Sequence, residues 1–398
     1  MEMNDKEWTV QGFTASAVAA GIKYKDRLDL GLIFSEGPAV AAGVFTTNQV
    51  KAAPVLLSQE HLRANRARAI IVNSGNANAC TGKDGLYRAR LTAERVAKEL
   101  SIRPEEVLVA STGVIGAPLN TDAVSASLPA LVKGLSPGGI PRVVEAMMTT
   151  DSFPKRALFQ GEAGGKPFRI IGVAKGAGMI MPDMATMLCF VLSDIRVQDH
   201  ELKKALASAV QRSFNRITVD GDTSTNDTVF VLANGRAGNG PLSTVDLESF
   251  ERGLQFVMEE LAAMMVRDGE GATKLVRLQV KGAASESDAE KAARTVANSS
   301  LVKTAFYGAD ANWGRIMAAL GRSGIRMEAE KTDIWVDEVK IVEAGLGIGA
   351  AAEEKAQVRM KGKEFSVTID LGQGAHEDRI LTCDLTHEYV SINANYRT

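Results

Sequence analysis

The spacing of apolar residues predicts a mixture of helices and strands. Apolar positions recur at three- and four-residue steps over residues 89–100, 199–214 and 245–266, the pattern of amphipathic helices. Capping residues predict two more helices, one beginning near Asn120 and one over residues 285–297. Short apolar runs predict strands at residues 40–46, 69–73, 107–111, 187–192, 275–280, 333–342, 365–371 and 387–392. The order of these elements indicates α and β layers, with a small α+β unit from about residue 280.

Composition limits the class of protein further. The chain has 398 residues, of which 45% are hydrophobic and 24% charged, and its formal net charge is −2. This length suits two or three domains, or one large domain with a smaller one. There is no block of Lys and Arg of the kind that follows a nucleic-acid backbone, and no apolar stretch as long as a bilayer span. The first residues are acidic and polar, unlike a signal peptide, so we expect a cytoplasmic protein.

The cysteines and histidines predict neither disulfides nor a metal site. Cys80, Cys189 and Cys383 are widely separated, and we interpret them as buried thiols in a reducing compartment. The four histidines do not cluster with one another or with a cysteine pair. We therefore expect no metal and no cofactor.

The most informative segment spans residues 175–188, a glycine-rich run that begins with Lys175 and leads into a predicted strand. Thr186 follows the small Ala185 at the start of that strand. A hydroxyl there is able to attack the preceding peptide bond, and cleavage would give Thr186 a free amine that acts as its own base. A phosphate-binding P-loop is excluded, because Lys175 precedes its glycine and Pro182 interrupts the run. From these residues alone, a simple connecting loop is the more common role.

Four other segments carry polar groups that suit catalysis or binding. The turn at Thr112 and Gly113 offers a hydroxyl and backbone N–H groups to an oxyanion. Residues 148–155 contain a cluster of hydroxyls ahead of a proline, and Glu270 stands between glycines in a loop. Residues 390–398 run from the last predicted strand into a series of amides and hydroxyls. Each segment by itself is explained as well by an ordinary turn, a solvated loop or an edge strand.

Together, and in this order, the segments resemble the ornithine acetyltransferase family, the self-cleaving bifunctional glutamate N-acetyltransferases of arginine biosynthesis. The resemblance covers essentially the whole chain. It is carried by GVFTTN (43–48), NSGNANA (73–79), STGVIG (111–116), MTTD (148–151), KGAGMI (175–180), MATML (184–188), DGEGATK (268–274), YGADANWGR (307–315) and YRT (396–398). So many motifs in one order make a chance agreement negligible.

The resemblance implies a role for each matching residue. Thr186 looks like the nucleophile, freed by self-cleavage of the Ala185–Thr186 bond, and Thr112 and Gly113 look like the pair that forms the oxyanion hole. The family's substrate-binding positions fall on Ser152, Lys175, Thr186, Glu270, Asn393 and Thr398. Threonine is the more usual residue at the position of Ser152, and the serine retains the hydroxyl.

The resemblance also implies the fold and the subunits. We expect an α/β fold, an α+β layered sandwich of the self-processing, N-terminal-threonine type shared by ornithine acetyltransferases and related aminopeptidases. Self-cleavage would leave an α chain, residues 1–185, and a β chain, residues 186–398, assembled as an α2β2 heterotetramer. Within the β chain, residues 186–280 would complete the catalytic domain. Residues 281–398 would form a smaller C-terminal α+β domain whose tail returns to the active site.

The reaction implied is acetyl transfer from N2-acetylornithine to glutamate through an acetyl-Thr186 intermediate, with acetyl-CoA as an additional donor in some members. Lys175, or Asn393 with Thr398, would hold a substrate carboxylate, and Glu270 would hold an amine. Two alternatives stay open: a self-processing amidohydrolase or aminopeptidase that uses water as acceptor, and a nonenzymatic protein that binds a small amino acid. Neither nucleic acid nor a membrane is expected as a partner.

Overall fold

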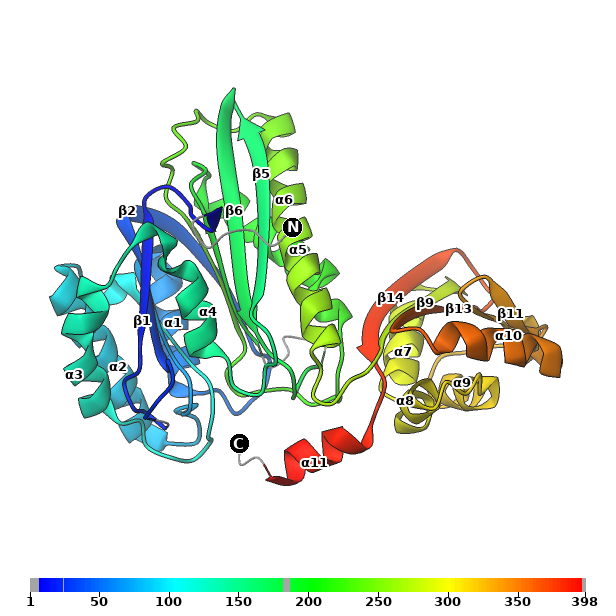
Figure 1. Ribbon diagram of the computed structural model, residues 1–398. Coiled ribbons are helices and arrows are strands. Elements are labelled where there is room, and N and C mark those ends of the chain that lie inside the picture. The colour runs from blue at the N-terminus through cyan, green and yellow to red at the C-terminus, as the bar shows by residue number, and fades with distance from the viewer. Residues whose placement is uncertain (1–6, 24, 182–186, 396–398) are drawn as a thin grey trace.

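The computed structural model describes residues 7–23, 25–181 and 187–395, which form two β-sheets with helices packed against them (Figure 1). The first sheet contains β1 (Phe13–Val18), β2 (Leu30–Phe45), β3 (Arg66–Asn73), β4 (Val107–Ser111), β5 (Lys155–Ala163), β6 (Lys166–Lys175), β7 (Leu188–Ser193) and β8 (Thr228–Ala233). The second contains β9 (Leu275–Ala283), β10 (Asp333–Val336), β11 (Val339–Glu343), β12 (Leu346–Gly347), β13 (Glu364–Asp370) and β14 (His376–Cys383).

The helices follow the same chain order. They are α1 (Ala53–His61), α2 (Gly82–Leu100), α3 (Thr121–Lys133), α4 (Ile140–Met147), α5 (Asp199–Arg212), α6 (Thr244–Arg267), α7 (Glu286–Ala297), α8 (Ser300–Tyr307), α9 (Trp313–Gly321), α10 (Ala350–Met360) and α11 (His387–Asn395). Within the described ranges, no helix has the length and apolar character needed to cross a bilayer.

The first sheet has the strand order β4-β3-β2-β8-β7-β6-β5, with β1 paired to the first half of β2. Strands β7 and β8 are parallel, and β6 runs antiparallel to β7. Lys175 at the end of β6 therefore pairs with Leu188 at the start of β7, which pairs in turn with Thr228 at the start of β8. The loops that follow β6 and precede β7 and β8 consequently meet at one end of the sheet.

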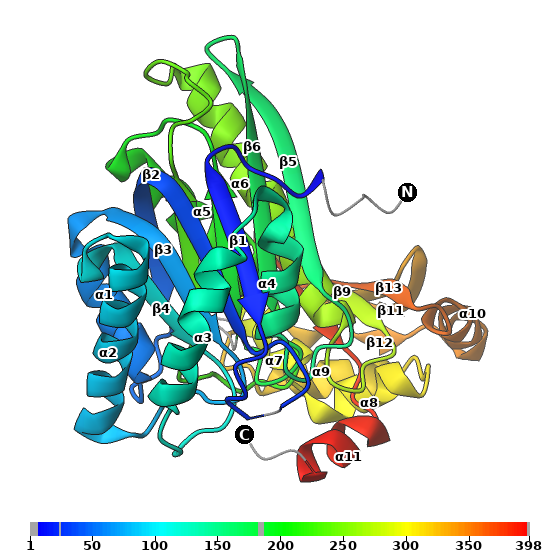
Figure 2. The same cartoon turned by 60° about the vertical axis from the view of Figure 1, so that its left-hand side comes forward.

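Both faces of the first sheet are buried, which explains the uninterrupted apolar run of β7. Phe190 and Leu192 belong to a core that includes Phe230 and residues of α4, whereas Cys189 and Val191 belong to a core with α5 and α6. Figure 2 shows α4 in front of the sheet and α5 and α6 behind it. A sheet held between helical layers is the predicted α/β layered fold, and that prediction is confirmed.

The second sheet packs one face against its own helices, and part of its other face, at Leu275 and Cys383, joins the core of the first sheet. Its strand order is β12-β11-β10-β13-β9-β14, and its core contains residues of β9, such as Val276 and Leu278, packed with residues of α7 to α10. Between these two residues, Arg277 points to the other face and is exposed. This alternation is typical of a sheet with one solvated face.

Three helices begin at side-chain caps, of which the two at Asn120 and Ser285 were predicted from the sequence. The side chains of Asn120, Ser243 and Ser285 each accept a hydrogen bond from the backbone amide three residues further on. Such a bond satisfies one of the amides that the first turn leaves without an intrahelical partner. The helix predicted over residues 245–266 is therefore confirmed almost to the residue.

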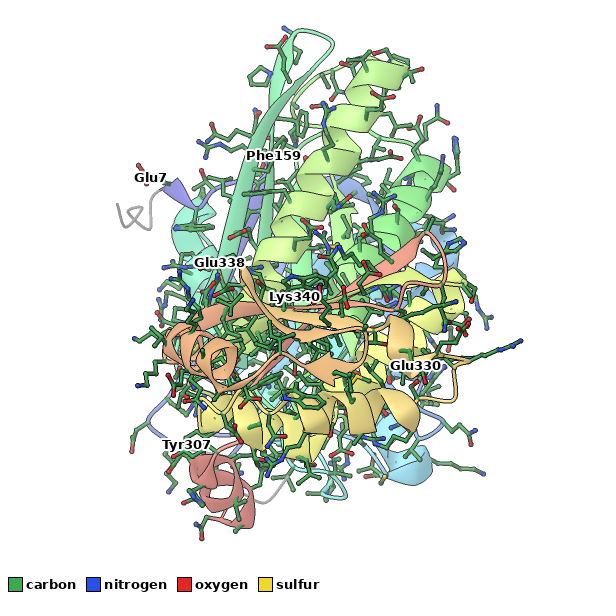
Figure 3. All side chains as sticks on the ribbon, turned by 90° about the vertical axis from the view of Figure 1, so that its right-hand side faces the viewer. Glu7, Phe159, Tyr307, Glu330, Glu338 and Lys340 are labelled. Atoms are coloured by element: carbon green, nitrogen blue, oxygen red, sulfur yellow. The ribbon has the colours of Figure 1, made fainter. Side chains whose placement is uncertain are left out.

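Two predicted strands are wrong. The run 333–342 is divided into β10 and β11 by a turn at Asp337, which has a left-handed backbone with φ of 48°. The run 387–392 lies in the helix α11, because the Thr386 hydroxyl accepts the Tyr389 N–H at 3.3 Å and caps its first turn. Figure 3 shows Tyr307 of α8 directly beside this helix, and the ring of Tyr307 meets that of His387 edge-on with centroids 6.0 Å apart.

The cysteine prediction is wrong at one position. Cys189 and Cys383 are buried thiols as expected, but Cys80 is exposed. Cys80 lies in the loop between β3 and α2 with a left-handed φ of 56°, so the chain turns there at the surface.

Candidate active site

Loops that are distant in sequence line one cavity at the end of the first sheet. Its lining residues among those described are Ala77, Thr112, Gly113, Ile115, Thr149, Thr150, Lys175, Gly178, Met179, Asp220, Asp222, Ser224, Thr225, Asn226, Glu270, Tyr389 and Asn393. They come from the loops after β3, β4, α4 and β6, the loop before β8, the loop after α6, and α11. Most of them are polar, as expected of a site for a small charged molecule.

The turn at Thr112 and Gly113 follows directly after β4. Its backbone is fixed by the Thr112 N–H, which donates to Asn73 O at 2.9 Å. Gly113 has φ of +130°, and a Cβ there would lie 2.3 Å from the carbonyl carbon of Gly75. Only glycine fits this position. The turn therefore presents the Thr112 hydroxyl to the cavity on a rigid backbone.

Lys175 ends β6 with its side chain only 4% exposed. Its Nζ donates to Thr149 Oγ1 at 2.7 Å and, in a longer bond of 3.4 Å, to Thr112 Oγ1. Burial lowers the pKa of Lys175, and the charge of nearby Lys155 acts in the same direction, whereas Asp151 and Glu270 raise it. The ammonium thus lies between two threonine hydroxyls, one of which belongs to the predicted oxyanion pair.

Asp151 lies beneath Lys175 and joins it to a second lysine. Its Oδ2 is 3.8 Å from Lys175 Nζ, and its Oδ1 accepts from Lys155 Nζ at 2.7 Å and from Gly176 N at 2.6 Å. Burial would raise the pKa of Asp151, but the ammonium groups of Lys175 and Lys155 outweigh this and hold it at about 2. Asp151 is therefore an anion at neutral pH.

Glu270 is held against the loop that follows β6. Its backbone N–H donates to Ala177 O at 2.8 Å, and its Oε2 accepts from Asn393 Nδ2 of α11, also at 2.8 Å. A Cβ on Gly178 would lie 2.3 Å from Oε2, so glycine is needed for the carboxylate to occupy this place. The predicted residues Glu270 and Asn393 are thus direct partners.

Asp220 and Tyr389 are two cavity residues that were not predicted from the sequence. The carboxylate of Asp220 accepts from Met179 N at 2.6 Å and Ile180 N at 2.8 Å, and the Tyr389 hydroxyl lies 3.3 Å from its Oδ2. Burial raises the pKa of Asp220, although these backbone bonds oppose it. Burial and the neighbouring carboxylates also raise the pKa of Tyr389. In the sequence, the polar run at residues 220–227 was the feature from which Asp220 could have been predicted as a site residue.

Asp227 immediately precedes β8, and its side chain binds the backbone just before β7. It is fully buried, and its Oδ1 accepts the backbone N–H of Met187 at 3.0 Å. Its Oδ2 has no hydrogen-bond partner among the described residues. Burial raises the pKa of Asp227 well above its usual range, against the effect of the Met187 amide. A buried carboxyl group with a raised pKa therefore binds the amide of Met187, the residue that follows Thr186 in the sequence.

The structure brings together five of the predicted site residues. Thr112, Gly113, Lys175, Glu270 and Asn393 all line the cavity. Ser152 lies beside it: its N–H and hydroxyl both bind the carboxylate of Asp268. The other predicted positions, Ala185, Thr186 and Thr398, lie outside the described residues.

The model of the ArgJ family matches this chain over residues 14–398. The chain belongs to the ArgJ family. This membership confirms the resemblance to ornithine acetyltransferases found in the sequence motifs.

Relatives of the ArgJ family match the chain from end to end. The arginine biosynthesis bifunctional protein ArgJ of Desulfotalea psychrophila is 52% identical, and that of Geobacter sulfurreducens is 50% identical. Each alignment covers 98% of this chain and 100% of the relative. The crystal structure of the ArgJ protein of Bacillus halodurans is 42% identical with a TM-score of 0.50, and the match covers 52% of this chain and 98% of that one.

Proposed function

We propose that this protein is a glutamate N-acetyltransferase of arginine biosynthesis that moves the acetyl group of N2-acetylornithine to glutamate through Thr186. The observation that carries the proposal is the cavity in which Thr112, Lys175 and Glu270 converge. Its relatives are named arginine biosynthesis bifunctional proteins, which supports the same reaction.

Self-cleavage would come first. The Thr186 hydroxyl attacks the Ala185 carbonyl, the C–N bond breaks, and the hydroxyl proton passes to the nitrogen of Thr186. Water then hydrolyses the ester, which leaves a carboxylate on Ala185 and a free amine on Thr186. Asp227 is well placed to carry the proton, because it binds the amide of the next residue and its other oxygen has no partner among the described residues.

Acetyl transfer would follow in two steps. The Thr186 amine, with an ordinary pKa of about 8, takes the hydroxyl proton as Oγ1 attacks the acetyl carbonyl. Thr112 and Gly113 stabilise the oxyanion, where one donor is typically worth about 3 kcal/mol. Ornithine leaves with the proton, glutamate enters, and its amine takes the acetyl group from Thr186.

The charges of the cavity fit both amino acids. Lys175 supplies one positive charge, and Asp220, Asp222 and Glu270 supply negative charges. N2-acetylornithine carries a carboxylate and an ammonium group, and glutamate carries two carboxylates and an ammonium group. An amino acid is therefore oriented by opposite charges at the two sides of the site.

We infer that both products of the cut stay in one sheet. The cut would fall between β6 and β7, yet β7 and β8 lie between β6 and β2 in the sheet. Residues 1–185 and 186–398 thus remain joined by strand pairing. The solved chain of the Bacillus halodurans relative is about half as long as this chain, which fits such a cut.

The proposal also covers the domains of the β chain and the assembly of the subunits. In the β chain, residues 186–280 complete the catalytic domain and residues 281–398 form the smaller one. We propose an α2β2 heterotetramer in the cytoplasm, for which the native mass is the test. A mass equal to one α and one β chain would contradict the tetramer and leave the reaction untouched.

The deciding experiment compares the wild type with Thr186→Ala. Intact-mass measurement is expected to find two chains for the wild type and one uncut chain for the variant. Acetylglutamate is expected from N2-acetylornithine and glutamate only with the wild type. Release of acetate without acetylglutamate would instead identify an amidohydrolase, and cleavage of the variant would refute the role of Thr186. A parallel assay with acetyl-CoA tests the second donor.

A further inference from the structure

Lys155 is a buried lysine that the proposed reaction does not use. It is the first residue of β5, and its side chain is fully buried. Its Nζ donates to Asp151 Oδ1 at 2.7 Å and to Asp268 Oδ2 at 2.5 Å. The carboxylates are also buried, with side-chain exposures of 0% for Asp151 and 3% for Asp268. Burying these charges is costly, so their arrangement calls for an explanation.

The four charges form a chain in which positive and negative groups alternate. Asp268 binds Lys155, Lys155 binds Asp151, and Asp151 lies 3.8 Å from Lys175. Each ammonium lies beside a carboxylate, so the buried group as a whole is close to neutral. Without Lys155, Asp151 and Asp268 would repel each other in a medium of low polarity. Asp151 would then no longer be held beneath Lys175.

The position of Lys175 determines which hydrogen bonds the Thr112 hydroxyl accepts and which it is free to donate. An ammonium group only donates hydrogen bonds, so Thr112 Oγ1 must accept from Lys175. The hydrogen of that hydroxyl then remains free to donate, and among the described residues it has no acceptor. A hydroxyl that accepts from a cation is also a stronger donor. Lys175 thus directs the Thr112 O–H into the cavity.

We propose that Lys155 is a positioning residue for the oxyanion hole: through Asp151 it holds Lys175 against Thr112 and so fixes the Thr112 hydroxyl as a donor. The inference rests on the proposed acetyl transfer and names a residue that acts on its transition state. Lys155 itself is not among the described residues that line the cavity. Its effect is therefore expected in kcat, since the oxyanion exists only in the transition state.

The test uses Lys155→Met, with Lys303→Met as the matched control. Lys303 is also a buried lysine, 3% exposed, but its Nζ donates to neutral partners in the second sheet, Thr382 Oγ1 at 3.0 Å and Cys383 O at 2.5 Å. Acetyl transfer is measured per mole of cleaved protein, as counted by intact mass. Lys155→Met is expected to lower kcat on the order of 100-fold with KM changed less than threefold, and the control is expected to leave both unchanged.

Repeating the substitution in a Thr112→Val protein distinguishes a positioning role of Lys155 from a general loss of structure. In Thr112→Val the hydroxyl is absent, so adding Lys155→Met is expected to lower kcat by less than a further threefold. An equal loss in both backgrounds would overturn the proposal, as would a change in KM alone. If Lys155→Met does not fold, Thr149→Val is tested in its place. This variant removes the shortest hydrogen bond that Lys175 Nζ donates, the one to Thr149 Oγ1. It is expected to lower kcat about tenfold, and an unchanged kcat would also overturn the proposal.

The pH profile supplies a signature that a structural role would not produce. Lys175 faces Asp151, Lys155, Glu270 and Asp227, and the charge of Lys155 lowers its pKa. Because only the protonated form of Lys175 is unable to accept, and so leaves the Thr112 hydroxyl free to donate elsewhere, kcat is expected to fall as pH rises through the pKa of Lys175. Lys155→Met removes a charge that lowers the pKa of Lys175, but it also releases Asp151, whose charge raises that pKa more strongly. The fall in kcat is therefore expected to move to lower pH. A move to higher pH, which the loss of the Lys155 charge alone would give, would contradict the proposed role of Asp151 as the link between the two lysines. A wild type that forms no acetylglutamate would instead refute the proposed function.

Discussion

Gly178→Ala is expected to disable the cavity without disturbing the fold. The new Cβ would lie 2.3 Å from Oε2 of Glu270 and 2.4 Å from its Cδ. Ordinary contacts begin near 3.4 Å, so the carboxylate must retreat by about 1 Å. A displacement of this size at a reacting centre costs on the order of 100-fold in rate. The backbone of Gly178 is not left-handed, so alanine itself is tolerated there.

The measurement is kcat/KM for acetyl transfer, together with the melting temperature. Gly240→Ala is the matched control, because a Cβ there meets nothing within 4 Å and its backbone is also not left-handed. We expect Gly178→Ala to lose about 100-fold in kcat/KM and the control to lose nothing, with similar melting temperatures for both. Full activity in a well-folded Gly178→Ala would refute the placement of the Glu270 carboxylate in the working site.

Three further outcomes are expected. Asp227→Asn keeps the shape of the side chain but cannot carry a proton, so self-cleavage should slow about 100-fold in an intact-mass time course. An unchanged rate would exclude Asp227 as the proton carrier. Asp151 has a folded pKa of about 2 against 3.8, so it adds about 2 kcal/mol of stability above pH 4 that is lost as pH falls toward 2. When the free energy of unfolding is measured in urea as a function of pH, Asp151→Asn should lose less stability on acidification than the wild type. Parallel curves for the two proteins would contradict this. A thiol reagent should label Cys80 in the native protein but spare Cys189 and Cys383, and three labels would refute their burial.

Elements with a strong periodic signal were predictable from the sequence. The cap at Ser243 and the apolar stripe of α6 define that helix locally, and β7 is apolar throughout because both its faces are buried. The tail at residues 387–392 contains the aromatic and β-branched residues typical of a strand, yet it is helical. Its conformation depends on the Thr386 cap and on Tyr389 meeting Asp220, which is 169 residues away in the chain.

The sequence by itself determined the motifs, the family, and five residues that the fold then gathers in one cavity. Three of them lie in loops, whereas Lys175 ends β6 and Asn393 lies in α11, and the chemistry of each side chain is known without coordinates. Only the tertiary structure revealed the charges beneath the cavity. Lys155 reads as an ordinary surface lysine at the start of a strand, but it is buried between Asp151 and Asp268, the latter 113 residues away. Which groups share a buried space depends on how the loops pack together, and no local pattern of residues records that.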